Sequence, residues 1–178
     1  MSSEISYREL APNELERVEE IDRTELITHI YYMRDGELVL EEERYDMKDW
    51  PPGRLPEIKE HLHSCLAEGG SAWGAFDGER LVGIGALDGR WYGGRGRTLD
   101  MYFLHVSDGY RHRGIGRKMV ELAKGRAREM GAERLFVSGL PSLNTIRFYM
   151  SVGFDIAEDV DPRLYAREPE DIHMDLEL

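Results

Sequence analysis

The chain has little cysteine, few long apolar runs and a shortage of basic residues. Cys65 is the one cysteine among 178 residues, so an internal disulfide is excluded and a cytoplasmic location is expected. No run approaches the ~20 apolar residues of a membrane-spanning helix. The start, MSSEISYREL, is polar and lacks the apolar core of a signal peptide. We therefore expect no membrane association.

The shortage of basic residues also bears on binding partners. The chain carries 35 Asp and Glu against 23 Lys and Arg, a formal net charge of -12. Such a chain lacks the broad basic face that a nucleic-acid backbone requires, and an anionic membrane surface would repel it. We expect neither as a partner. The length suits one domain, residues 1–178, with a core of its own.

One segment departs from this acidic balance. Residues 110–128 begin with YRHRGIGRKMVELA and carry one acid, Glu121, against seven cations: Arg111, Arg113, Arg117, Lys118, Lys124, Arg126 and Arg128. A local positive segment in an acidic chain indicates an anionic ligand. The alternative is an ordinary helix with a solvated basic face.

Two glycines in this segment favour the ligand. Gly114 and Gly116 stand between a predicted strand that ends near Val106 and a predicted helix that starts near Arg117. Glycine tolerates positive φ and lets backbone N–H groups approach a ligand closely. At the positive end of a helix these groups form a phosphate or pyrophosphate site, to which Arg111 and Arg113 add full charges.

Two other phosphate motifs do not fit. A P-loop needs Lys and Ser or Thr after its second glycine, but Ile115 and Gly116 stand there. A dinucleotide fingerprint needs a third glycine after Gly83 and Gly85, and Asp88 occupies its place.

The pattern of apolar residues and turns predicts an α/β (α+β) fold, with a single mixed, largely antiparallel central sheet flanked by helices. Strands are expected at residues 5–10, at 71–77 and 79–89 around a turn at Asp77–Gly78, and at 98–106 and 133–140. Helices are expected from Asn13, over Leu55–Ala67, over 116–131 and up to Gly153. Two strands close the chain within residues 155–178. Residues 22–56 are harder to interpret: DRTELITHI could form a second short helix, and the following IYYMRDGELVL could form a hairpin that turns at Asp35–Gly36.

Two stretches together resemble the motifs of the GNAT superfamily of acyl-CoA-dependent N-acyltransferases. LHVSDGYRHRGIGR matches the coenzyme-binding motif at Arg111, Gly114 and Gly116. SLNTIRFYMSVGF matches the second motif, about thirty residues later, at Ser142, Phe148, Tyr149, Gly153 and Phe154. The resemblance covers residues 5–154 and implies the GNAT fold, in which a strand splays from its neighbour to admit the coenzyme.

The resemblance also implies how acetyl-CoA, the co-substrate, would bind. Its pyrophosphate would rest on the backbone of the glycine loop: His112, Arg113, Gly114, Ile115, Gly116 and Arg117. Its pantetheine arm would pair with the backbone of Leu104, His105 and Val106. The usual Asn of the second motif is replaced by Ser142, with Asn144 two residues later, so either could flank the coenzyme.

The resemblance places Tyr149 as the general acid that protonates the departing thiolate, although a tyrosine at this helical position could equally be a core residue. The base is open, because LFVSGL lacks the Glu that some family members carry. Asp100 is a candidate, with a solvated strand-end carboxylate as the alternative. His105 is expected to be packed rather than basic, and no metal is expected.

These features predict an N-acetyltransferase that moves an acetyl group from acetyl-CoA to the primary amine of a small molecule or amino acid derivative by direct attack. Residues 22–56 would shape the acceptor side, and the acidic surface mildly favours a cationic acceptor. The alternatives are a protein N-terminal or lysine acetyltransferase, a non-catalytic acyl-CoA-binding module, or a protein that binds ATP or NAD. The resemblance also allows a homodimer.

Overall fold

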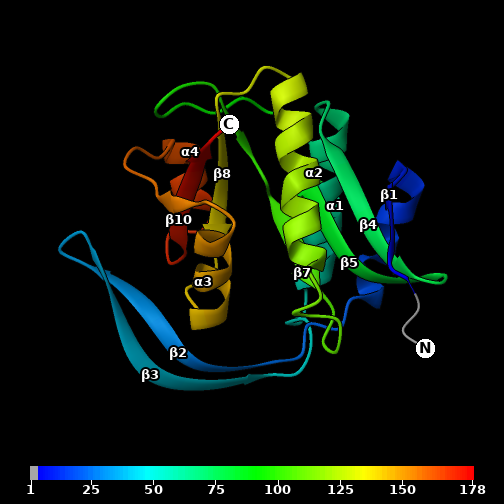
Figure 1. The fold of residues 1–178 in the computed structure, drawn as a ribbon, viewed down its shortest axis with the longest axis horizontal. Coiled ribbons are helices and arrows are strands. Elements are labelled where there is room, and N and C mark those ends of the chain that lie inside the picture. Colours follow the sequence, from blue (N-terminus) through cyan, green and yellow to red (C-terminus); the bar gives the residue numbers. More distant parts are fainter. Residues whose placement is uncertain (1–3) are drawn as a thin grey trace.

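Three separate sheets carry the strands in the computed structural model, which describes residues 4–178 (Figure 1). The first has the order β1 (Ser6–Glu9), β4 (Ser71–Asp77), β5 (Arg80–Leu87) and β7 (Phe103–Val106). The second has the order β6 (Thr98–Asp100), β8 (Arg134–Gly139), β10 (Ile172–Glu177) and β9 (Asp155–Ile156). The third is the hairpin of β2 (Glu25–Arg34) and β3 (Glu37–Met47).

Helices cover both faces of the first sheet. The 3-10 helix η1 (Pro12–Glu20) and α1 (Arg54–Ala67) bury one apolar cluster with β4 and β5, while α2 (Ile115–Glu129) packs against the opposite face. Both strands are buried almost throughout, as expected of a sheet covered on two sides. The second sheet carries α3 (Leu143–Ser151) and α4 (Pro162–Arg167), and the hairpin passes beneath α3 (Figure 1).

The prediction of one central sheet is wrong, because the strand predicted at residues 98–106 breaks at Met101 and Tyr102. Before the break, β6 pairs in parallel with β8, and after it β7 pairs antiparallel with β5. The Met101 N–H still donates to the Phe136 carbonyl at 2.9 Å. Beyond this point the chain follows the other sheet, so β7 and β8 diverge. The expected splayed strand pair therefore exists, but as a boundary between two sheets.

The hairpin predicted for residues 30–40 is confirmed, but the short helix predicted for residues 22–30 is wrong, because β2 already begins at Glu25. The turn falls at Asp35 and Gly36, with φ of 51° and 80°. Ile27 and Ile30 are three residues apart, so a helix would bring them to one face, whereas a regular strand would turn them to opposite faces. A bulge between Ile27 and His29 shifts the register, so both isoleucines are buried.

Two further expectations need correction. The first helix was expected to begin at Asn13, but it is a 3-10 helix in which the Glu14 carboxylate accepts the Ala11 N–H at 2.9 Å. Residues 155–178 hold not only strands but also α4, whose N-cap Asp161 accepts the Arg163 N–H. The other helices match their expected positions within a few residues. Within residues 4–178, every helix is too short or too polar to traverse a lipid bilayer.

Leu135 fills the core where β6 meets β8 and is fully buried. We expect Leu135→Ala to lower the free energy of unfolding by about 2–5 kcal/mol, because it removes buried methyl groups and leaves a cavity. Leu40→Ala on the exposed hairpin is the matched control and should change it by less than about 0.5 kcal/mol. Urea denaturation of both variants checks this. Equal midpoints would contradict the assigned core.

Candidate active site

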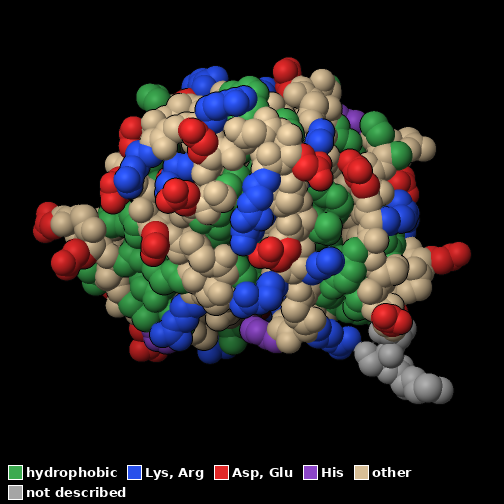
Figure 2. Space-filling view, turned by 45° about the horizontal axis from the view of Figure 1, so that its top comes forward, with side chains coloured by type: hydrophobic (Ala, Val, Ile, Leu, Met, Phe, Trp, Pro, Cys, Tyr) green, Lys and Arg blue, Asp and Glu red, His purple; other side chains and the backbone are tan. Residues whose placement is uncertain are grey.

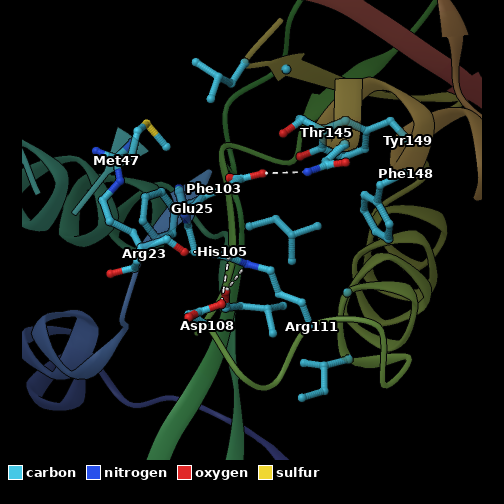
Figure 3. A pocket seen from close by; sticks show the side chains of 18 of the residues that line it. Arg23, Glu25, Met47, Phe103, His105, Asp108, Arg111, Thr145, Phe148 and Tyr149 are labelled. Carbon is cyan, nitrogen blue, oxygen red and sulfur yellow. Dashed lines mark hydrogen bonds and ion pairs between the residues drawn. The ribbon is translucent and has the colours of Figure 1, made fainter. Parts of the chain in front are cut away.

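A cleft of about 1150 Å³ opens where β7 and β8 diverge. Its walls come from β7, the 108–114 loop with the start of α2, the end of β8, α3, and the first residues of the hairpin. In Figure 3, Phe103, His105 and Arg23 lie on one side of β7, whereas Phe148 and Tyr149 lie on the other. The cleft thus has two arms that meet at the β7 strand.

The outer edge of β7 offers backbone groups to the cleft. The Ser107 N–H donates to Val82 of β5 at 2.9 Å, so this residue's polar groups point into the sheet. Because direction alternates along an antiparallel strand, Leu104 and Val106 present theirs outward. The Val106 carbonyl accordingly accepts from Arg111 Nε at 3.1 Å rather than from β5. An extended ligand can pair along this edge, as the resemblance implies.

The glycine loop ends at the cleft with the N-terminus of α2. Gly109, His112 and Gly114 have φ of 78°, 62° and 81°, so the loop folds through left-handed backbone conformations. The Lys118 N–H donates to the Gly114 carbonyl at 3.0 Å, which begins the helical ladder. The N–H groups just before Lys118 have no intrahelical acceptor and lie at the positive end of the helix dipole. The geometry of an anion site is therefore present.

The three arginines of this loop region differ in their surroundings. Arg111 donates to the carbonyls of Val106 and Thr24, the latter at 2.7 Å, and so ties the loop to the hairpin. Arg113 is exposed and lies 5.0 Å from the Tyr110 ring centroid, away from the cleft wall. Arg117 lies on the wall. Basic and acidic side chains are interspersed on the face that Figure 2 shows.

Asn144 and Ser142 have separate places. Ser142 is 1% exposed and caps α3, because its Oγ accepts the Thr145 N–H at 3.2 Å. Asn144 lies on the cleft wall, and its Nδ2 donates to Glu25 of the hairpin at 3.3 Å. Among the residues that the structure describes, Asn144 rather than Ser142 can therefore contact a ligand in the cleft.

Tyr149 lies on the cleft wall as a largely buried side chain. Its ring packs over Gly139 and meets Phe154 edge-on, with centroids 5.4 Å apart. Burial raises the pKa of the phenol, and the charges of Asp100 and Asp171 raise it further. The phenol therefore stays protonated at neutral pH, the state that a proton donor needs.

Asp100 is not placed as expected. Its carboxylate is fully buried and forms an ion pair with Arg167 at 2.5 Å. Asp100 is therefore not in contact with solvent and does not line the cleft. Burial raises the pKa of Asp100 and the charge of Arg167 opposes that rise. The break at Met101 also separates Asp100 from Tyr102, which therefore does not share a strand face with it. The solvated-carboxylate alternative is wrong as well.

A pair of acids that the sequence did not single out lies on the wall instead. Asp171 precedes β10, accepts from Ser138 Oγ at 3.1 Å and is half-buried. Burial, followed by the charge of Glu168, raises the pKa of Asp171 to about 6. Glu168 itself is paired with Arg54 at 2.8 Å. The acidic run EPEDIHMD was the available signal, and it is typical of a solvated turn.

His105 is packed, as expected. Its ring lies 4.5 Å from that of Phe103 and 5.2 Å from that of Trp50 between centroids. Burial lowers the pKa of His105 to about 3, and the charges of Arg23, Arg111 and Arg54 act in the same direction. The imidazole is therefore neutral at physiological pH.

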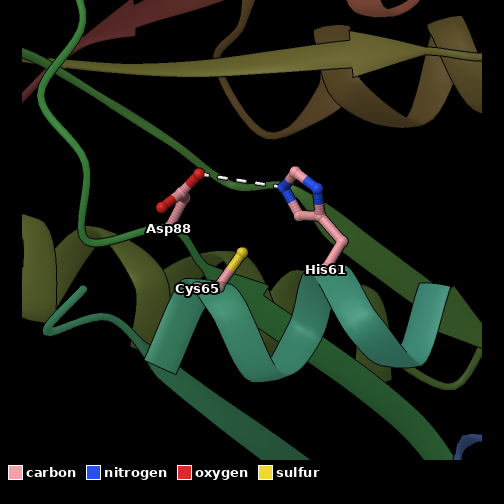
Figure 4. Close-up of side chains that lie close together, drawn as sticks. All are labelled: His61, Cys65 and Asp88. Atoms are coloured by element: carbon pink, nitrogen blue, oxygen red, sulfur yellow. Dashed lines mark ion pairs between the residues drawn. The ribbon is translucent and has the colours of Figure 1, made fainter. Parts of the chain in front are cut away.

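His61, Cys65 and Asp88 form a second polar group behind this wall, with ligand-type atoms all within 4.8 Å of one another (Figure 4). The separation between His61 Nε2 and Asp88 Oδ2 is 3.9 Å. Asp88 already accepts from the Arg90 side chain and from the Tyr92 hydroxyl. Since Arg90 balances the charge of Asp88, a divalent cation would add uncompensated charge to a buried site.

Comparison with known proteins assigns the family. Residues 20–154 match the model of the acetyltransferase (GNAT) family, so the chain belongs to that family and is an acetyl-CoA-dependent acetyltransferase. No curated protein sequence matches the chain.

Solved structures agree in fold. Nourseothricin acetyltransferase is 22% identical, with a TM-score of 0.69 over 97% of this chain and 98% of that one. A candidate streptothricin acetyltransferase from Bacillus anthracis str. Ames, in complex with acetyl coenzyme A, is 20% identical, with a TM-score of 0.72 over 98% and 99%. PaiA N-acetyltransferase from Thermoplasma acidophilum, in complex with coenzyme A, is 17% identical, with a TM-score of 0.62 over 98% and 99%.

Gly116 of the glycine loop packs directly against Phe148 of α3. A Cβ at Gly116 would lie 3.0 Å from the ring. We expect Gly116→Ala to cost about 1–3 kcal/mol of stability through overpacking, and to weaken CoA binding because the cleft wall must shift. Gly125→Ala in the same helix meets nothing within 4 Å and should stabilise by about 0.5–1 kcal/mol. Thermal unfolding and calorimetric titration with CoA check both, and unchanged CoA affinity in Gly116→Ala would contradict the site.

Proposed function

We propose that this acetyltransferase transfers the acetyl group to the primary amine of a small molecule or amino acid derivative. The observation that carries the proposal is the meeting of three features in one cleft: the free edge of β7, the N-terminus of α2 and the protonated Tyr149. Backbone groups and helix dipole suit the pantetheine and pyrophosphate of the co-substrate. The other arm of the cleft, on the side of β7 where Arg23, Phe103 and His105 lie, leaves room for an acceptor and is called the acceptor arm below.

The edge of β7 and Tyr149 divide the chemistry of acyl transfer between them. The amine attacks the thioester carbonyl, and an outward N–H of Leu104 or Val106 stabilises the oxyanion that forms. When this intermediate collapses, the C–S bond breaks and the Tyr149 hydroxyl gives its proton to the thiolate, while the former amine nitrogen loses its surplus proton through water, which returns a proton to the Tyr149 phenolate and leaves the neutral amide and CoA thiol. The pKa of Tyr149 is raised by burial, which keeps that proton available.

Asp171 replaces Asp100 as the proposed base. An attacking amine must first lose a proton, because the ammonium form has no lone pair. Asp171 lies on the cleft wall, and its charge contributes to the pKa of Tyr149. Asp100 is paired with Arg167 away from the wall. With a pKa of about 6, Asp171 accepts a proton more readily than an ordinary carboxylate, directly or through a water molecule.

Support for a small acceptor comes from the neighbours in structure. Two of them are named for nourseothricin and streptothricin, which are small molecules, and each covers nearly the whole chain. The acceptor arm is also narrowed by aromatic side chains, since Trp50 and Phe103 stack with ring centroids 6.1 Å apart. This favours a small amine over a folded protein.

Tyr149→Phe should lower kcat by about a hundredfold or more, because the variant removes the general acid and keeps the ring. The measurement is release of free CoA thiol from acetyl-CoA across a panel of small amines. Tyr165→Phe, at an exposed tyrosine, is the matched control and should keep full activity. Full kcat in Tyr149→Phe would contradict the acid role.

Asp171→Asn should remove the acidic limb of the pH–rate profile. A base must be deprotonated to act, so wild-type kcat should fall as pH decreases through about 6, the raised pKa of Asp171. The variant should be slow and show no such limb, while the KM for acetyl-CoA stays near its wild-type value. A profile identical to that of the wild-type enzyme would show that another group is the base.

A further inference from the structure

Arg23 stands out among the charged residues of the acceptor arm because its guanidinium has almost no partner. The side chain lies on the cleft wall near Met47 (Figure 3). Its Nη2 reaches the Met47 sulfur at 3.6 Å, its carbon Cζ lies 5.0 Å from the Trp50 ring centroid, and its buried Nε has no acceptor. A guanidinium carries five N–H donors, so most of these remain available.

The acids nearest to Arg23 are engaged elsewhere. Glu25 accepts from Asn144 at 3.3 Å, and Asp49 accepts the Trp50 N–H at 2.7 Å. Farther along the wall, Glu168 is paired with Arg54. Among the described residues, no carboxylate lies within ion-pair distance of Arg23. The fold therefore holds a partly buried cation without a direct ion-pair partner, and the charges of Glu25 and Asp49 act on it only from a greater distance.

The guanidinium of Arg23 is a cationic group on the cleft wall of a chain that is acidic overall. The chain carries a formal net charge of -12, yet the buried His105 beside this part of the wall is affected by the positive charges of Arg23, Arg54 and Arg111. A desolvated, unpaired guanidinium is costly, and a carboxylate ligand satisfies it with two parallel hydrogen bonds. Arg23 therefore favours an acceptor that carries an acid group over the purely cationic acceptor that the overall charge suggested.

We infer that Arg23 binds a carboxylate of the acceptor, so that the acceptor is an amine that also carries an acid group, such as an amino acid. This inference rests on the proposed function. Arg23 lies on the side of β7 opposite Tyr149 (Figure 3), and the α2 N-terminus, not Arg23, offers the phosphate site. A carboxylate held at Arg23 leaves the amine of a short molecule free to point toward β7.

Matched acceptor pairs test the inference. Amino acids, their amides and the corresponding decarboxylated amines are compared by kcat/KM from thiol release with acetyl-CoA. The wild-type enzyme should prefer the acid over its amide by about tenfold or more, because the hydrogen bonds are charge-assisted. Arg23→Gln should abolish that preference through the acceptor KM, with the KM for acetyl-CoA unchanged, and Arg23→Lys should retain part of it. Arg34→Gln, an exposed hairpin arginine paired with Glu41, should behave as wild type.

A binding measurement keeps the inference separate from the proposed function. N-acetyl amino acids and their N-acetyl amides, which mimic product, are titrated calorimetrically into the CoA-loaded protein. The acids should bind more tightly to wild type than the amides, and Arg23→Gln should lose the difference. Equal binding of both, or a wild-type preference for amides or decarboxylated amines, would overturn the inference even if acetyl transfer is observed. Acid-selective binding without turnover of any amine would leave the inference standing and refute the proposed function.

Discussion

The divergence of β7 from β8 is the constraint on which the rest of the site depends. Beyond Met101, the chain hydrogen-bonds to β5 and no longer pairs with β8. The freed edge of β7 would be a liability on a protein surface, because unpaired backbone groups invite other strands. Here α3, the hairpin and the glycine loop surround this edge of β7, so it forms the floor of a cleft. Hydrogen-bonding capacity that the sheet does not use is thereby available to a ligand.

The two arms of the cleft have different chemistry because different elements line them. On one side, buried Tyr149 keeps its proton, and Asp171 has a raised pKa. On the other, Arg23 lies beside a histidine that burial and positive charges keep neutral. Desolvation is the common cause, since water would otherwise level these pKa values toward those of free side chains. A protonated phenol, a carboxylate of raised pKa and an unpaired guanidinium thus line one cleft.

Particular residues show how far sequence reasoning reached. Gly114, Gly116 and Tyr149 do line the cleft, because loop glycines and a helical motif are local features, and their roles stay predictions. Asp100 does not line it, since a strand pattern reports which residues alternate but not where a strand breaks or what pairs with its carboxylate. Asp171 and Arg23 lie some 150 residues apart in the chain. Neither stands in a motif, and only packing brings both to the same wall.

The sequence by itself determined most of the helices, strands and turns, the glycine loop ahead of α2 and the family, because these follow from short-range spacing of apolar residues, glycines and polar caps. The tertiary structure alone decided that the strands form three sheets, that a bulge buries both Ile27 and Ile30, and which charged residues are paired. These outcomes depend on contacts between segments distant in the chain, and on how completely those contacts exclude water from each polar group.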